Sequence, residues 1–274
     1  MKTTIINKRL GTIISILMFL FSVTSCTEVI SFDFNEVESQ LVIEAYVPES
    51  QNAEVMITKT MSFNTNNQPN HVTGALVILE DGNGMQEMLQ EVAPGHYHSS
   101  KIKGVPGMSY KLTVETDNEY REIQSVDVMP STPVSMSRLR VRESNMPDVD
   151  GLPLPAWEVI VEYEDPEDEK NYYRFVEYIN GKPFASYVEN DKFNNGMKNK
   201  SFLTSTTRSL VPGDTLTVEM QVISKAVYDY FYGFSLLNTL PQGSNVVNPV
   251  TNISGVKLGY FSAHTVNRRS VVIK

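Results

Sequence analysis

The segment Thr215–Ile223 reads TLTVEMQVI, and apolar side chains recur at every second position from Leu216 to Val222. A β-strand places successive side chains on opposite faces, so this alternation predicts a strand with one buried and one solvated face. One-sided burial of this kind is typical of antiparallel sheets. The turn residues at positions 211–214 (VPGD) predict the connection that leads into the strand.

The next segment, residues 224–240 (SKAVYDYFYGFSLLNTL), has a different period. Its apolar residues lie three or four positions apart, which is the spacing of one face of an α-helix. Ser224 is a suitable N-cap, and Pro241 ends the pattern. We therefore expect one amphipathic helix in an otherwise β segment. Its predicted inward stripe consists of Val227, Tyr230, Phe231, Phe234 and Leu237.

Short runs of β-branched and aromatic residues, separated by turn residues, predict strands along the rest of the chain. Residues 81–84 (DGNG) and the pair Asn180 and Gly181 supply the positive φ angles that tight hairpins need. Two prolines at positions 129–133 (MPSTP) interrupt the pattern, and we place a domain boundary there. The other expected strands are residues 41–47, 54–59, 75–80, 85–92, 96–99, 109–115, 120–128, 137–142, 156–163, 171–179, 256–261 and 270–273.

The N-terminal residues resemble a bacterial export signal. Lys2, Lys8 and Arg9 precede the uncharged run 11–25, which fits the n-region and h-region of a signal peptide. The run is short for a permanent membrane-spanning helix. It ends in VTSC at Cys26, which resembles the lipobox of lipoproteins in Gram-negative envelopes. We expect cleavage before Cys26 and acylation of its thiol. The alternative is an ordinary cleaved signal peptide, or a loosely held hydrophobic anchor that happens to end in cysteine.

Acylation of Cys26 predicts a permanent tether. A lipoprotein cysteine carries two or three acyl chains, and each buried methylene contributes about 0.8 kcal/mol. Cys26 is the only cysteine, so no disulfide or thiolate site is expected in the acylated protein. Residues 27–58 contain acidic but no basic residues. The expected organisation is a signal peptide (1–25), a lipidated acidic leader (26–39), a first sandwich (40–130) and a second sandwich (134–274) with the helix 224–240.

Composition and motifs argue against several classes of function. The net charge of −9 argues against nucleic-acid binding, which needs clustered basic residues. His96 and His98 share one side of a strand and suit a metal, but no third ligand is identifiable and an exposed strand face is the favoured interpretation. The acids at 148–150 and 165–169 lack the spacing of an EF-hand. No nucleophile elbow or phosphate-binding loop occurs, so we expect no catalytic residues, metal or cofactor.

Tyr228 and Tyr232 are the candidate partner-binding residues. They lie one helical turn apart, on the side of the predicted helix away from its apolar stripe. Tyrosine buries well at interfaces because it combines a large ring with a polar hydroxyl. Covering the flank of the core is the alternative role for both residues.

The order of these motifs resembles the family called domain of unknown function 4249, over nearly the whole chain after the lipobox. The first half carries the resemblance in LVIEAYV, VTGALVILEDGNG, PGHYHS and GVPGMSYKLTVE. The second half carries it in NYYRFVEYING, LVPGDTLTVEMQVISKAVYDYF and NPVTNISGVKLGYFSAHTVNRRSVVI. Members of that family resemble outer-membrane lipoproteins of the Bacteroidota found beside TonB-dependent receptors.

The resemblance implies a fold and a setting but no catalytic residue. The first half is similar to transthyretin-like and carboxypeptidase-regulatory sandwiches, and the second to a fibronectin type III sandwich. We therefore expect a mainly β protein of two antiparallel β-sandwiches, anchored by lipid in the outer membrane and facing either the cell surface or the periplasm.

The expected role is that of a non-enzymatic accessory or ligand-binding component of a TonB-dependent nutrient uptake system. The expected partners are outer-membrane lipid and a TonB-dependent receptor. A structural or adhesive surface lipoprotein that binds host or matrix polymers is the main alternative, and a hydrolase with an unrecognised site is another.

Overall fold

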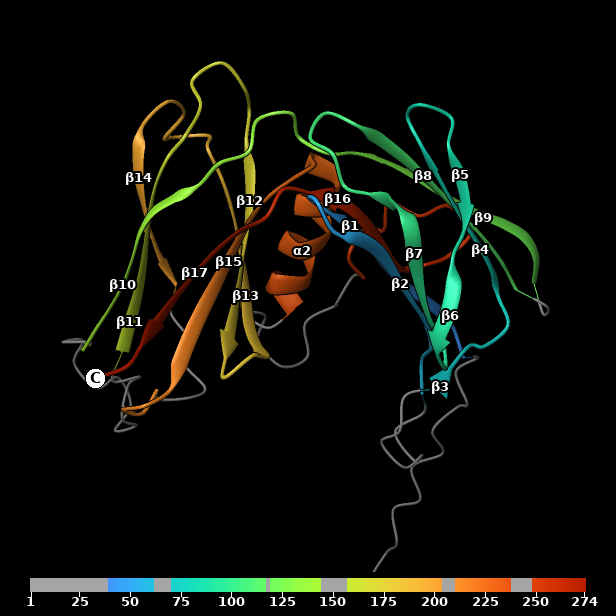
Figure 1. Cartoon of the computed structure of the whole chain (residues 1–274), viewed down its shortest axis with the longest axis horizontal. Helices are drawn as coiled ribbons and strands as arrows, with labels where there is room; N and C mark the ends of the chain where they lie inside the picture. The colour runs from blue at the N-terminus through green and yellow to red at the C-terminus, as the bar shows by residue number, and fades with distance from the viewer. Residues whose placement is uncertain (1–38, 62–69, 117–118, 144–156, 204–209, 238–247) are drawn as a thin grey trace, which may run out of the picture. The chain divides into compact units, whose positions relative to one another are not determined.

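The computed structural model of the chain describes residues 39–61, 70–116, 119–143, 157–203, 210–237 and 248–274 (Figure 1). These residues form strands β1 to β17 and the helix α2. The predicted mainly β fold class with one inserted helix is therefore confirmed for the described residues. Cys26 and the predicted signal peptide lie outside them, so acylation and export stay predictions.

The first sandwich consists of a six-stranded and a four-stranded sheet. The first sheet has the order β16-β1-β2-β7-β6, with β3 beside β2, and the second has the order β5-β4-β8-β9. The first sheet contains β1 (Leu41–Pro48), β2 (Asn52–Lys59), β3 (Asn70–His71), β6 (Gln90–Ala93), β7 (His96–Lys103) and β16 (Leu258–His264). The second sheet contains β4 (Leu76–Asp81), β5 (Gln86–Met88), β8 (Ser109–Thr116) and β9 (Glu119–Val128).

The two sheets of the first sandwich bury their alternating apolar residues in one core. Ile43 and Ile57 come from the first sheet, and Leu79 and Leu112 come from the second, and all four are fully buried in the same cluster. Burial of such a side chain contributes about 1.5–3 kcal/mol relative to leaving it exposed. Two sheets that share a core in this way form a β-sandwich.

The second sandwich is built in the same way from a three-stranded and a four-stranded sheet. Their orders are β10-β11-β14 and β13-β12-β15-β17. The strands are β10 (Met136–Glu143), β11 (Trp157–Glu164), β12 (Tyr172–Ile179), β13 (Lys182–Asn190), β14 (Lys198–Leu203), β15 (Thr215–Ile223) and β17 (Asn267–Val272). Leu216, Val218, Met220 and Val222 of β15 are all buried in the core of this sandwich, as their alternation predicted. Glu219 and Gln221 on the other face are buried as well, so the predicted solvated face is wrong at these positions. The helix α2 (Lys225–Leu237) follows β15 directly.

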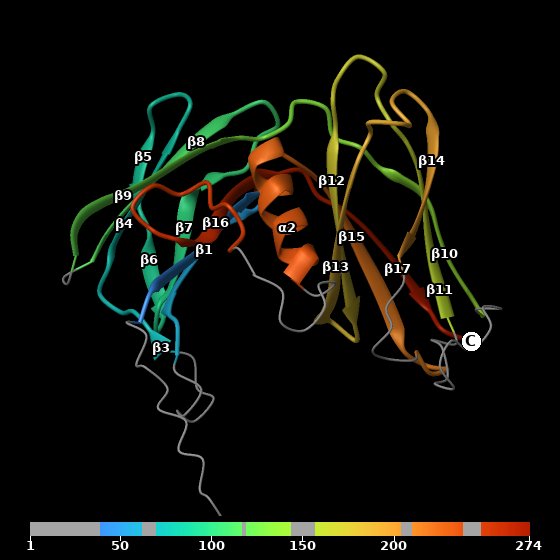
Figure 2. The same ribbon diagram turned by 180° about the vertical axis from the view of Figure 1, so that it is seen from behind.

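Strand β16 corrects one sequence-based expectation. The sequence pattern at 256–261 predicts a strand of the second sandwich, and that prediction is wrong. β16 instead pairs in parallel with β1, from Val42 opposite Leu258 to Pro48 opposite His264. Figures 1 and 2 both show β16 beside β1, after which the chain continues into β17 of the second sandwich. Alternation gives the faces of a strand but not its neighbour, so the sequence did not reveal this pairing.

The predicted return strand at 85–92 is divided in two. β5 pairs with β4 in one sheet and β6 pairs with β7 in the other, and the buried Leu89 lies between them. The carboxylate of Glu87 accepts hydrogen bonds from the backbone N–H groups of Ser100, Lys101 and Ile102. The chain therefore turns a corner between the two sheets at this point.

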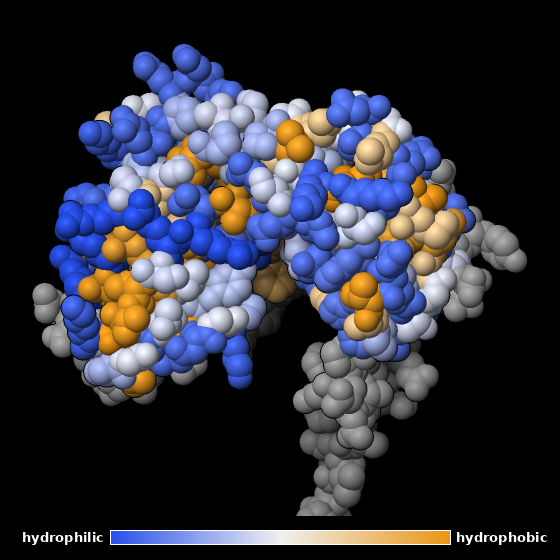
Figure 3. Space-filling model, viewed as in Figure 1, coloured by the Kyte–Doolittle hydropathy of each residue, from blue (hydrophilic) through white to orange (hydrophobic). Residues whose placement is uncertain are grey.

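The surface of the described part is a patchwork of hydrophilic and hydrophobic residues, as Figure 3 shows for one face. On β10, β11 and β14, part of the polar surface consists of ion pairs between neighbouring strands, such as Arg142 with Glu158 at 2.5 Å and Lys200 with Glu162 at 3.8 Å. In the described ranges, no helix has the length and apolar character needed to cross a bilayer.

Candidate functional site

The helix α2 begins at a local capping arrangement. The Ser224 hydroxyl accepts a hydrogen bond from the N–H of Val227 at 3.4 Å, and the Ser224 carbonyl accepts one from the N–H of Tyr228 at 3.0 Å. Lys225 and Asp229, one turn apart, form an ion pair at 2.6 Å. The predicted N-cap and the start of the helix are therefore confirmed.

The apolar stripe of α2 is buried only in part. Val227 is fully buried, and Tyr230 and Phe231 pack against Tyr260 of β16 with ring centroids 5.3 and 4.7 Å apart. Phe234 is 51% exposed, so its predicted inward position is wrong. The helix rests on β12, β13 and β16, and its second half leaves apolar side chains at the surface.

Tyr228 and Tyr232 lie together, as their spacing predicted. Their rings stack with centroids 5.7 Å apart and planes 13° apart. On its other side, Tyr228 lies 5.1 Å from the ring of Tyr172 on β12. The three tyrosines form a continuous aromatic row that joins the helix to the sheet, which we call the tyrosine row. Their proposed role in partner binding stays a prediction.

A groove of about 440 Å³ is lined by two rings of this row, those of Tyr172 and Tyr228. Its charged side chains are mainly basic, in a chain whose net charge is −9. We call it the lysine groove. It is lined by Lys170, Tyr172, Asn190, Asp191, Lys192, Asn195, Lys225, Tyr228 and Asp229.

Both carboxylates that line the lysine groove interact with other groups of the protein. Asp191 is buried and accepts a hydrogen bond from the N–H of Asn171 at 2.6 Å. Asp229 pairs with Lys225. The three lysines and two aspartates of the lining give the groove a formal net charge of +1, which favours an anionic or strongly polar ligand.

The Tyr228 hydroxyl is fixed in position at the edge of the groove. It accepts a hydrogen bond from the Asn190 side-chain amide at 2.8 Å. Burial raises the pKa of Tyr228, so the hydroxyl keeps its proton at neutral pH. Because the oxygen accepts from Asn190, the proton can be donated to another acceptor.

A further hollow of about 420 Å³ adjoins the groove, because Lys170, Tyr172 and Lys225 line both. The two hollows together form an extended surface that can contact an elongated ligand. Lys170, Asn190 and Lys192 were not identified from the sequence. Lys170 precedes β12, whereas Asn190 and Lys192 lie at the end of β13, and the β12–β13 hairpin brings both places beside α2.

The acidic residues and histidines considered as metal ligands lie elsewhere in the fold. Asp165 is buried, accepts hydrogen bonds from the Tyr173 hydroxyl and from the N–H of Gly196, and so serves the fold. The acids at 148–150 lie outside the described residues. His96 and His98 lie on one side of β7, as predicted, but in the part of the chain that the structure describes no group of three or more histidine or acidic residues is arranged to hold a metal ion.

Comparison with known proteins gives a family but no activity. The chain matches the family model described as Domain of unknown function (DUF4249) over residues 27–270. No curated protein matches it. Among solved structures, it is similar to a segment of two fibronectin type III domains from chicken tenascin, with 11% sequence identity, coverage of 68% of this chain and 91% of that chain, and a TM-score of 0.22. The order of motifs predicted the family, and the match over residues 27–270 confirms that this chain belongs to the DUF4249 family.

Proposed function

We propose that this protein is a non-enzymatic lipoprotein of the outer membrane that binds ligand for a TonB-dependent nutrient uptake system. The lysine groove with its tyrosine row carries the proposal. Tyrosine rings, side-chain amides and lysine ammonium groups are recognition groups that stack on a ligand or donate hydrogen bonds to it. The lipobox-like sequence at Cys26 supports the membrane setting.

The groove is better suited to binding than to acid–base catalysis. A general acid or base needs a titratable group that can reach the substrate. Asp191 is buried against the backbone of Asn171, and Asp229 is paired with Lys225. The carboxylates that line the groove therefore maintain its shape, and the side chains left to meet a ligand are lysines, tyrosines and amides.

The anchoring part is tested by mass spectrometry of the N-terminus. The protein purified from membranes should begin with an acylated Cys26. Cys26→Ser should lose the acyl mass and move from the membrane fraction to the soluble fraction. A mature N-terminus other than an acylated cysteine contradicts the proposal.

The partner is tested by purification of the native protein in mild detergent after crosslinking in cells. A TonB-dependent receptor should be recovered with the wild-type chain. Tyr228 and Tyr232 are the predicted partner-binding residues, so the double variant Tyr228→Ala and Tyr232→Ala should recover much less of it. Phe202→Ala is the matched control, because Phe202 is also an exposed aromatic residue, on β14. Equal recovery with the double variant, or no receptor with the wild-type chain, contradicts the proposal. Recovery of a host or matrix polymer instead supports the adhesive alternative.

A further inference from the structure

Three of the four histidines gather on the outer face of the first sheet. His71 lies on β3, and His96 and His98 lie on β7. In the strand register, His71 is opposite Thr58 of β2 and His96 is opposite Met56. Thr58 and Met56 are on the same face of β2, because side chains two positions apart in a strand point the same way. His71 and His96 are therefore neighbours on this face, although they come from different strands.

The backbone of Ile57 on β2 fixes the chain at both histidines. Its N–H donates a hydrogen bond to the carbonyl of Gly95 at 2.9 Å, and its carbonyl accepts one from the N–H of Val72 at 3.0 Å. His71 comes directly before Val72, and His96 comes directly after Gly95. β3 and β7 therefore follow one another along the same edge of β2, and one histidine lies on each side of the point where they meet.

The two imidazole rings lie at a distance that suits a shared metal ion. Their centroids are 5.4 Å apart, and their planes are tilted by 46°. Two imidazoles that bind one tetrahedral zinc ion have centroids about 5 Å apart, because each zinc–nitrogen bond is about 2.0–2.1 Å. Gly95 leaves the space that the His71 ring needs, since a Cβ added to it would lie 3.2 Å from Nδ1 of His71.

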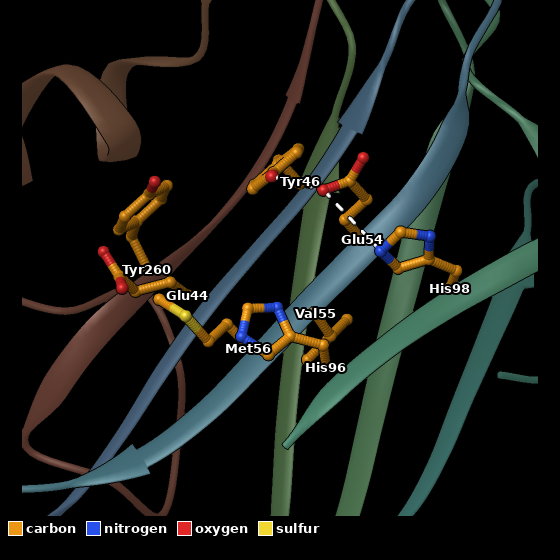
Figure 4. A pocket seen from close by; sticks show the side chains of 8 residues that line it. All are labelled: Glu44, Tyr46, Glu54, Val55, Met56, His96, His98 and Tyr260. Carbon is orange, nitrogen blue, oxygen red and sulfur yellow. Dashed lines mark hydrogen bonds and ion pairs between the residues drawn. The ribbon is translucent and has the colours of Figure 1, made fainter. Parts of the chain in front are cut away.

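The hydrogen bonding of the rings distinguishes His71 from His98. Nδ1 of His71 is buried and has no hydrogen-bond partner among the described residues, whereas buried polar atoms are usually hydrogen-bonded. The hydrogen bond at one ring nitrogen normally decides which nitrogen carries the proton, so no such bond at Nδ1 restricts this ring. Nε2 of His98 lies 3.8 Å from the Glu54 carboxylate, and Figure 4 shows this ring turned toward Glu54. The available pair is therefore His71 with His96.

We propose that His71 and His96 together bind one divalent transition-metal ion. Imidazole nitrogen is a suitable ligand for zinc, copper and nickel. Two protein ligands leave the other coordination positions to water or to donor atoms of a small molecule. His96 also lines a hollow of about 190 Å³, which gives such donors room (Figure 4). The histidine pair shares no residue with the lysine groove and is independent of the uptake function proposed for it.

The test is calorimetric titration of zinc chloride into the full-length chain in mild detergent at pH 7.5. The wild-type chain should bind one zinc ion at this site. His71→Gln and His96→Gln should each weaken this binding at least tenfold, because each removes one of the two protein ligands. His98→Gln is the matched control on the same strand and should bind zinc as the wild-type chain does. His71→Asn and His96→Asn repeat the measurement where a glutamine variant does not unfold cooperatively.

Copper gives a second readout, which counts the imidazole ligands. Pulsed electron paramagnetic resonance of the Cu²⁺-loaded chain should detect two imidazole rings in the wild-type and His98→Gln proteins. It should detect one ring in His71→Gln and in His96→Gln. Absence of zinc binding by the wild-type chain overturns the proposal. So does unchanged affinity in folded His71→Gln or His96→Gln protein, or a loss in His98→Gln equal to that in His96→Gln.

Discussion

Glu177 on β12 carries a buried carboxyl group that has few hydrogen bonds to offset the cost of its burial. Its side chain is 2% exposed, and Oε2 accepts only a long hydrogen bond of 3.5 Å from the Tyr187 hydroxyl. Oε1 has no hydrogen-bond partner among the described residues. Burial raises the pKa of Glu177 to about 7, whereas its ordinary value is 4.5. The charged form is therefore destabilised in the folded protein.

This shift predicts a pH-dependent stability. The unfolded chain releases the Glu177 proton near pH 4.5 and the folded chain near pH 7, so the stabilising contribution is complete below 4.5 and is lost as the pH rises through 7. At pH 8, Glu177→Gln should raise the free energy of unfolding by about 1–3 kcal/mol, and at pH 5 by much less. Urea unfolding at both pH values measures this, with the exposed Glu115→Gln as control. An equal effect at both values would contradict the prediction.

Single residues also show how far the sequence could predict the binding surface. Tyr228 and Tyr232 were identifiable because helical spacing places them on one face. No local pattern in the sequence distinguishes Lys170, Asn190 and Lys192 from other polar surface residues. They line the groove only because the β12–β13 hairpin lies beside α2. The part of the binding surface that lies on one helix is therefore predictable from local spacing, whereas the part that depends on packing between elements is not.

At the scale of elements, the contact between β1 and β16 depends on Gly259. This residue has φ = 108°, and a Cβ added to it would lie 1.9 Å from the carbonyl oxygen of Ile43. Both the backbone conformation and the close approach therefore require glycine. No side chain can shift to relieve the clash, because the obstructing atom belongs to the backbone of the neighbouring strand.

Gly259→Ala should lower the free energy of unfolding by more than about 3 kcal/mol, the sum of backbone strain and steric overlap. Gly181→Ala is the matched control. Gly181 also has a positive φ, of 77°, but no atom lies within 4 Å of the added Cβ. Gly181→Ala should therefore lower the free energy of unfolding by only about 1 kcal/mol. Thermal and urea unfolding measure both variants, and similar losses in the two would show that the close approach is unimportant.

The start of α2 gives a second prediction at this scale. Ser224 caps the helix, and its hydroxyl also hydrogen-bonds to Asp127 of β9, whose pKa is raised to about 6 by burial. Ser224→Ala should therefore cost about 1 kcal/mol of unfolding free energy, and Ser224→Thr should restore most of it. Ser235→Ala, late in the same helix, should change stability by less than about 0.5 kcal/mol. If the two alanine variants melt alike, the cap is not stabilising.

The elements themselves were largely predictable, but their pairing was not. Alternation at 216–222 gave both the strand and its buried face, and Asn180 and Gly181 have the positive φ angles that a tight hairpin needs. β13 and β14 lack a clear apolar alternation and were not predicted. The pairing of β16 with β1 depends on residues more than two hundred positions apart, for which local periodicity contains no information.

At the scale of the whole molecule, the C-terminal residues serve both sandwiches. β16 covers the edge of β1, and β17 pairs with β15. A chain ending at Pro249 should therefore lose hydrogen-exchange protection in β1 and also in β15. Hydrogen exchange measured by mass spectrometry tests this prediction. β8 pairs with neither missing strand, so its backbone amides serve as the control and should keep their native exchange protection. Native protection of β1 in the shortened chain would show that β16 is dispensable.

The return of the chain to its first sheet also bears on how such proteins can diversify. In tandem-module proteins, one gene segment encodes one module, and recombination can exchange modules freely. Here a breakpoint in the 129–133 connection would separate β1 from β16, so neither product would carry a complete first sheet. Lineages that carry this topology should therefore inherit both sandwiches together and vary mainly in their surface loops.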